Sequence, residues 1–162
     1  MAKPICEELN PEQWRRLRSI RLASLLDSPD AFGGSYEKES AMSEADWRAL
    51  FDKNSYLVAS KDGEDIAMIF VENLKGDFGA TCWIGGCWTD PRFRGSGALR
   101  VIFDYLDERA AQRGWQVQGL GVFVTNKDAI AAYERLGFVV MGEPQESTRK
   151  PGNFYQRMIR GL

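Results

Sequence analysis

The feature that most constrains the fold is residues 91–97, Pro-Arg-Phe-Arg-Gly-Ser-Gly, between an apolar, tryptophan-rich run and a stretch with helical periodicity. A glycine-rich turn between a strand and a helix leaves backbone N–H groups free at the helix N-terminus, where the helix dipole favours an anion. Arg94 adds a fixed charge suited to a phosphate. The segment therefore predicts a strand–turn–helix unit that holds a phosphate-bearing ligand.

Hydrophobic periodicity on both sides of this turn predicts a mixed α/β sheet with helices on both faces. Gly85 and Gly86 interrupt the strand before the turn and indicate a bulge or a close approach of another backbone. The expected order is β-α-α-β-β-β-α-β-α-β-β. Strands are expected at 4–8, 56–60, 65–74, 80–89, 115–125, 138–141 and 154–159, helices at 10–26, 43–53, 98–113 and 126–136, and a loop or short helical turns at 28–40.

Composition limits what this chain can be. Its 162 residues are 44% hydrophobic, which fits one domain, 1–162, with a sizeable core. A net charge of −2 provides no basic field for nucleic acid. No apolar run is long enough to span a membrane, and the first residues do not resemble a signal peptide. Three cysteines indicate reduced thiols and a cytoplasmic protein.

The chain contains no histidine. This absence excludes Ser-His-Asp and Cys-His catalysis, and histidine-ligated metals. Cys82 and Cys87 lack the spacing of a zinc pair, so no metal is expected. Proton transfer would have to use carboxylates, tyrosine, cysteine, lysine, the backbone or water.

Two segments resemble motifs of the GNAT superfamily of acyl-CoA-dependent N-acetyltransferases. The first, residues 87–99, is similar to the superfamily's cofactor motif, in which a proline is followed by Arg-Gly-x-Gly-x-Gly/Ala. The second is Asn126-x-x-Ala129-x-x-x-Tyr133-x-x-x-Gly137-Phe138. The two occur in the expected order, about thirty residues apart. The resemblance covers residues 4–160, implies a GNAT-like, mostly antiparallel sheet, and implies acetyl transfer from acetyl-CoA to a primary amine.

The resemblance also implies roles for individual residues. The pyrophosphate of acetyl-CoA would bind the backbone amides of the glycine turn, with Arg94 beside them. The pantetheine arm would add like a strand to the end of the 80–89 strand, where one N–H would polarise the acyl carbonyl. Asn126 would cap the following helix and touch the cofactor arm. The implied cofactor-binding residues are Cys87, Trp88, Thr89, Arg94, Gly95, Ser96, Gly97, Ala98, Leu99 and Asn126.

Leu99 departs from the motif, which usually has glycine or alanine there. One interpretation is that Leu99 begins the apolar stripe of the helix, because its spacing to Ile102, Phe103 and Leu106 is helical. The other is that its side chain crowds the pyrophosphate and weakens cofactor binding. That second interpretation keeps open an alternative function, a non-catalytic acyl-CoA-binding or protein-interaction domain with the same fold.

Tyr133 is the candidate general acid. A phenol with a pKa of about 10 stays protonated at neutral pH and could protonate the departing thiolate, whose pKa is about 8.5. The alternative is that Tyr133 is a core aromatic of the stripe formed with Ala129, Ile130 and Leu136. An acyl-enzyme on Cys87 is disfavoured, because no base adjoins it in the sequence.

The acceptor side is poorly specified. Glu37 and Glu39 are weak candidates for a base acting through water, and solvated surface acids are the alternative. Arg18 and Arg21 would either bind an acidic acceptor or form internal ion pairs. The acceptor is expected to be a small-molecule or peptide amine, and the resemblance is compatible with a homodimer. A dinucleotide-binding oxidoreductase is set aside, because Gly-x-Gly-x-x-Gly is missing after the first strand.

Overall fold

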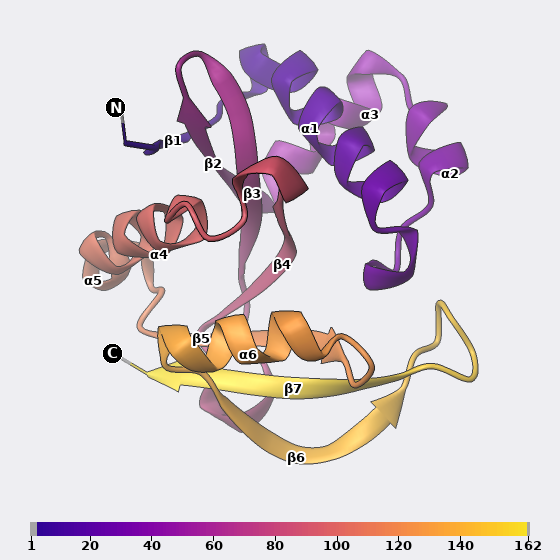
Figure 1. Cartoon of the computed structure of the whole chain (residues 1–162), viewed down its shortest axis with the longest axis vertical. Coiled ribbons are helices and arrows are strands. Elements are labelled where there is room, and N and C mark those ends of the chain that lie inside the picture. Colours follow the sequence, from indigo (N-terminus) through magenta and orange to yellow (C-terminus); the bar gives the residue numbers. More distant parts are fainter. Residues whose placement is uncertain (1–2, 162) are drawn as a thin grey trace.

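A computed structural model describes residues 3–161, which form a seven-stranded sheet flanked by helices (Figure 1). The strand order in the sheet is β1-β2-β3-β4-β5-β7-β6. The predicted mixed, mostly antiparallel sheet with helices on both faces is confirmed. The elements are β1 (Ile5–Glu8), α1 (Trp14–Asp27), α2 (Tyr36–Ser40), α3 (Glu44–Ala49), β2 (Asn54–Lys61), β3 (Glu64–Asn73), β4 (Cys82–Thr89), α4 (Ala98–Glu108), α5 (Ala110–Arg113), β5 (Val117–Phe123), α6 (Lys127–Leu136), β6 (Val139–Glu146) and β7 (Phe154–Gly161).

Two clusters of buried side chains, one on each face of the sheet, form the core. Along β2, Leu57 and Ala59 face the cluster beneath α4, whereas Tyr56 and Val58 face the cluster beneath α1. This alternation follows from the two-residue period of a strand. Helix α4 contacts β1, β2 and β3, and α1 contacts β3 and β4 on the opposite face (Figure 1).

The central feature of the sheet is the parallel pair β4–β5, since all the other neighbouring strands are antiparallel. The two strands pair only from Cys82 to Ile84 on β4, opposite Gln118 to Leu120 on β5. Beyond Ile84, β4 keeps pairing with β3 but changes register, and Gly86 adopts a positive φ of 60°. The predicted bulge is therefore present, at the point where β4 leaves β5.

Local sequence signals account for the ends of several helices. Ser43 and Asp46 form a capping box at the start of α3, within the helix expected at 43–53. Gly114 and Gly137 end α5 and α6 in the left-handed conformation. The helix expected at 98–113 is divided at Arg109 into α4 and α5. Helix α2 occupies part of the segment expected to be a loop or short helical turns, and β6 is longer than predicted.

Candidate active site

A cavity of about 880 Å³ lies beside the end of β4, in the part of this strand that no longer pairs with β5. Its walls come from the segment after α1, the end of β4, the turn before α4, and α6. Figure 1 shows the ribbon of α4 above that of α6 in this view. Ten of the eleven predicted site residues line the cavity: Cys87, Trp88, Thr89, Arg94, Gly95, Gly97, Ala98, Leu99, Asn126 and Tyr133.

The glycine turn presents bare backbone to this cavity. Gly95 and Gly97 have φ values of 79° and 87°, and no atom lies within 4 Å of where a Cβ on either would be. The first N–H groups of α4, like those of any helix, have no intrahelical acceptor. Gly97, the N-cap of α4, has no side-chain oxygen that could accept from them. The amide of Ser96, by contrast, donates to the Phe93 carbonyl at 3.1 Å, and Ser96 does not line the cavity.

Leu99 contacts the hydrophobic core and also lines the cavity. It is half-buried, packs against the core cluster beneath α4, and also lines the large cavity. This packing matches the interpretation that Leu99 begins the apolar stripe of α4.

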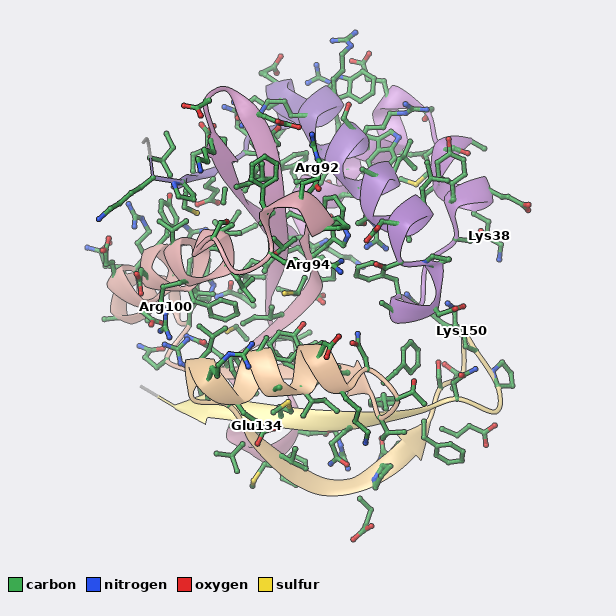
Figure 2. All side chains as sticks on the ribbon, in the orientation of Figure 1. Lys38, Arg92, Arg94, Arg100, Glu134 and Lys150 are labelled. Carbon is green, nitrogen blue, oxygen red and sulfur yellow. The ribbon has the colours of Figure 1, made fainter. Side chains whose placement is uncertain are left out.

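Arg94 connects the glycine turn to the end of α1. Its Nε donates to the Thr89 carbonyl at 3.1 Å, and its Nη2 pairs with Asp27 Oδ2 at 3.1 Å. The same Asp27 oxygen accepts from Trp88 Nε1 at 2.9 Å. Figure 2 shows Arg94 at the turn and Arg100 on α4 above α6. The guanidinium expected to face a phosphate is thus already paired with a carboxylate.

Sequence reasoning missed Asp27. Hydrogen bonds from Trp88 and Ser28, followed by the nearby Arg94, lower the pKa of this carboxyl, so it is ionised at neutral pH. Its only local signal was an acidic residue at the end of the first predicted helix, directly before Ser28 and Pro29. Nothing in that pattern indicates contact with Arg94.

Tyr133 and Cys87 meet at the inner end of the cavity. Tyr133 is 7% exposed and its ring packs edge-on against Phe138, with Cys87 near enough to influence its pKa. Burial, followed by the influence of Cys87, raises the pKa of Tyr133 well above its usual value. Burial also raises the pKa of the Cys87 thiol to about 11. Tyr133 is therefore both a core aromatic and part of the cavity wall, and Cys87 is a protonated thiol at neutral pH.

Asn126 is the N-cap of α6, as predicted. Its side-chain oxygen accepts from the Ala129 amide at 3.3 Å. The side-chain N–H groups of Asn126 are not used by this cap, and the residue lines the cavity. They are available to an acceptor oxygen.

A second cavity, of about 80 Å³, lies at the bulge. Phe32, Cys87 and Tyr133 line both cavities, so the two adjoin. Its other walls are apolar side chains and bare backbone of β4, β5 and α6, with Asn126. They include Ile84, Gly85, Gly86, Leu120, Gly121, Val122 and Ala129.

The predicted acceptor-side residues behave differently from one another. Arg21 forms an internal ion pair with Glu39, through Nε–Oε1 at 2.8 Å and Nη2–Oε2 at 3.1 Å. Arg18 donates to the Ser40 carbonyl at 3.3 Å. Glu37 is exposed, and neither it nor Glu39 lines either cavity. The structure therefore brings Arg21 and Glu39 together but gives neither carboxylate a position at the cavity wall.

The β6–β7 connection contacts the segment that follows α1. Lys150 donates through Nζ to the Pro29 carbonyl, and the Arg149 side chain packs against Gly33. Figure 2 shows Lys150 at this loop, beside the segment that follows α1. Two segments more than a hundred residues apart in the sequence therefore meet here, although neither Arg149 nor Lys150 lines a cavity.

The described residues provide neither a metal site nor a membrane-spanning helix. Over residues 3–161, no three histidine, cysteine, aspartate or glutamate side chains are grouped so that they could hold a metal ion. In the same range, every helix is too short or too polar to cross a membrane.

Comparison with known families decides the family of this chain. The model of the acetyltransferase (GNAT) family matches residues 14–138, which include both motifs and most of the cavity wall. The chain belongs to the GNAT acetyltransferase family. This GNAT chain is 30% identical, over 97 residues, to an uncharacterized N-acetyltransferase of Methanocaldococcus jannaschii. The match covers 57% of this chain and 42% of that relative, less than half of the relative's length.

Solved structures show the same fold. A putative acetyltransferase from Salmonella typhimurium, solved with acetyl-CoA, has a TM-score of 0.75 at 16% identity, and the match covers 99% of this chain and 95% of that one. A ribosomal-protein-alanine N-acetyltransferase from Brucella melitensis has a TM-score of 0.74 at 17% identity, with 98% and 99% covered. At these identities the likeness concerns the GNAT fold.

Proposed function

We propose that this protein is an N-acetyltransferase that moves an acetyl group from acetyl-CoA directly to a primary amine. The observation that carries the proposal is one cavity lined by both the glycine turn and Tyr133, where β4 and β5 diverge. The turn supplies an anion site, and the tyrosine supplies a proton beside the bulge. Direct transfer needs both groups on one ligand path, because donor and acceptor must meet in one orientation.

The residues present fit acetyl-CoA as the donor. The pyrophosphate would bind the free N–H groups at the start of α4, where Gly95 and Gly97 leave room for it. The pantetheine arm would run along the end of β4, at Cys87, Trp88 and Thr89, towards the Asn126 amide. A backbone N–H at the bulge would polarise the acyl carbonyl.

Tyr133 would protonate the departing thiolate. Its raised pKa keeps the phenol protonated throughout the neutral range but makes proton loss harder. The same burial acts on any thiol at this position, as the Cys87 pKa of about 11 illustrates. Burial at this site would raise the pKa of the departing thiol as well as that of Tyr133. The difference between the two pKa values, which opposes the proton transfer, is therefore smaller than the Tyr133 pKa alone suggests.

The acceptor would be an amine on a small molecule or a peptide. The Brucella melitensis structure supports a peptide, because that protein's name gives a ribosomal-protein alanine as its substrate. The three cysteines are unpaired, which fits the reducing cytoplasm expected from the sequence. Cys87 would not carry the acetyl group, because its thiol is protonated at neutral pH.

The test is Tyr133→Phe. We expect kcat to fall by about a hundredfold, because general acid catalysis contributes on this order. The dissociation constant for acetyl-CoA, measured by calorimetry, should change less than about twofold, because the ring and its packing remain. Tyr105→Phe is the matched control, since Tyr105 packs against the same core cluster without lining either cavity.

Two results would contradict parts of this proposal. Equal loss of turnover and of acetyl-CoA affinity in Tyr133→Phe would assign the residue a structural role only. Micromolar acetyl-CoA binding by the wild type without acetylation of any amine would favour the non-catalytic acyl-CoA-binding domain instead.

A further inference from the structure

The smaller cavity has a closed, apolar end where β4 and β5 separate. Ile84 is the last residue of β4 that pairs with β5, and its partner there is Leu120. Val122 is two residues further along β5, so it lies on the same face of that strand as Leu120. All three side chains line the cavity and belong to the core cluster beneath α4. They are between 2% and 7% exposed, so little solvent reaches this end.

The other end of the smaller cavity is at the proposed transfer site. Cys87 is three residues beyond Ile84 on β4, and both Cys87 and Tyr133 line the two cavities. On the α1 side of the bulge the space is already filled, because a Cβ on Gly86 would meet the Phe70 ring at 2.9 Å. The free space therefore extends from the transfer site along the strands towards the closed end.

The walls of this cavity disfavour a charged or strongly polar occupant. None of the residues 3–161 that line it is an aspartate, glutamate, lysine or arginine. Its polar side chains are Cys87 and Tyr133 at the transfer site, and Asn126 at the N-cap of α6. A polar group at the closed end would lose its hydration and gain no hydrogen bond from a side chain there. A hydrocarbon chain, in contrast, is stabilised by leaving water.

The volume of the smaller cavity limits the length of such a chain. About 80 Å³ holds roughly five to eight water-sized groups. An acetyl group has three non-hydrogen atoms, a butyryl group has five and an octanoyl group has nine. The cavity is therefore larger than an acetyl group requires, has room for a butyryl group, and is too small for an octanoyl group.

We infer that the smaller cavity receives the acyl group of the donor, and that the donor class is short, unbranched acyl-CoA thioesters of up to four carbons rather than acetyl-CoA alone. The inference rests on the proposed transfer from acetyl-CoA and widens its donor. The thioester would lie at the Tyr133 end, and the rest of the acyl chain would extend towards Leu120 and Val122. These side chains then determine the longest chain that the protein accepts.

The experiment is calorimetry of the wild-type protein with free CoA and with its acetyl, propionyl, butyryl, hexanoyl and octanoyl thioesters. The dissociation constant should fall about fourfold for each carbon added from acetyl to butyryl, because each added methylene is buried. Octanoyl-CoA should bind at least about tenfold more weakly than butyryl-CoA, because its chain exceeds the cavity. Binding needs no acceptor, so the measurement does not depend on knowing the amine.

Two substitutions of Val122 change the size of the closed end in opposite directions. Val122→Ile adds one carbon and should lower the affinity for butyryl-CoA relative to acetyl-CoA about tenfold, the usual effect of one methylene in an apolar pocket. Val122→Ala removes two methyl groups and should shift the tightest-binding donor from butyryl-CoA to hexanoyl-CoA.

Val71 provides the matched controls. It is 1% exposed and belongs to the same core cluster, but it lines neither cavity. Val71→Ile and Val71→Ala should therefore leave the order of donor affinities as it is in the wild type. Thermal unfolding of all four variants shows whether each is folded at the temperature of the binding measurements.

The outcomes separate this inference from the proposed function. Equal or weaker binding of butyryl-CoA compared with acetyl-CoA by the wild type would overturn the acyl pocket. An unchanged order of donor affinities in both Val122 variants, or the same shifts in the Val71 variants, would overturn it as well. Failure to bind any of these CoA compounds would instead overturn the proposed function.

Discussion

The two walls of the active site are built in different ways. The cofactor wall consists mainly of backbone within one short segment, where Gly95 and Gly97 expose the N–H groups of α4. The wall on the proposed acceptor side consists largely of side chains from the segment after α1 and the end of β4, such as Asp27, which accepts a hydrogen bond from Trp88. The first depends on local conformation and the second on tertiary packing.

The two walls therefore place different requirements on the sequence. A backbone anion site needs glycines at positive φ next to a helix start, and few other residues can adopt that conformation. A side-chain site can be built from many residue types, provided that the fold brings them together. The donor half of a two-substrate enzyme can thus keep one motif while the acceptor half varies.

The largest effect should come from adding a side chain to the cofactor wall. Gly95→Val should weaken acetyl-CoA binding by about a hundredfold, because valine at a φ of 79° is strained and its methyl groups would occupy the open space facing the cavity. The measurement is calorimetry with acetyl-CoA, alongside thermal unfolding.

Gly63→Val provides a control for the backbone strain. Gly63 has a φ of 80° and equally open surroundings, but it lies in the β2–β3 turn, away from both cavities. Both variants should lose about 1–2 kcal/mol of stability, the approximate cost of the left-handed conformation. If Gly63→Val loses acetyl-CoA affinity as severely, the glycine turn is not a specific phosphate site.

A smaller effect is expected at the ion pair between Asp27 and Arg94, which joins the two walls. Asp27→Asn should raise acetyl-CoA affinity about threefold, because it removes the negative charge paired with Arg94 and leaves that guanidinium for the phosphates. Asparagine can still accept from Trp88 Nε1, so stability should change by less than about 1 kcal/mol. The measurement is again calorimetry, repeated at two salt concentrations.

Asp30→Asn is the control for net charge. Asp30 lines the same cavity and has no ion pair in the structure of residues 3–161. If Asp27→Asn and Asp30→Asn raise the affinity equally, the effect is due to general electrostatics and the Arg94 contact has no special part in it. Unchanged affinity in Asp27→Asn would show that the guanidinium is not withheld from the donor.

The same contrast explains how far sequence analysis reached. The strands, the bulge at Gly85–Gly86, the caps of α3 and α6, and the meeting of the glycine turn with Tyr133 were predictable, because each depends on local propensity or a short motif. The Asp27–Arg94 and Arg21–Glu39 pairs were not, because they depend on contacts between distant segments. For Arg21, the sequence leaves open whether it binds an acidic acceptor or forms an internal ion pair. The structure shows the internal pair, between Arg21 and Glu39.

The smallest expected effect is the pH dependence of the contact between the walls. The pKa of Asp27 is lower in the folded protein than in the unfolded chain, chiefly because Trp88 and Ser28 donate to its carboxylate. Its contribution to stability is therefore fully present above the unfolded pKa of about 3.9 and is lost as the pH falls through the folded value. The difference in thermal midpoint between wild type and Asp27→Asn should be constant above about pH 5 and should shrink on further acidification. If that difference does not vary with pH down to the acid transition, the carboxylate contributes no charge-dependent stability, and the two walls are joined only by packing.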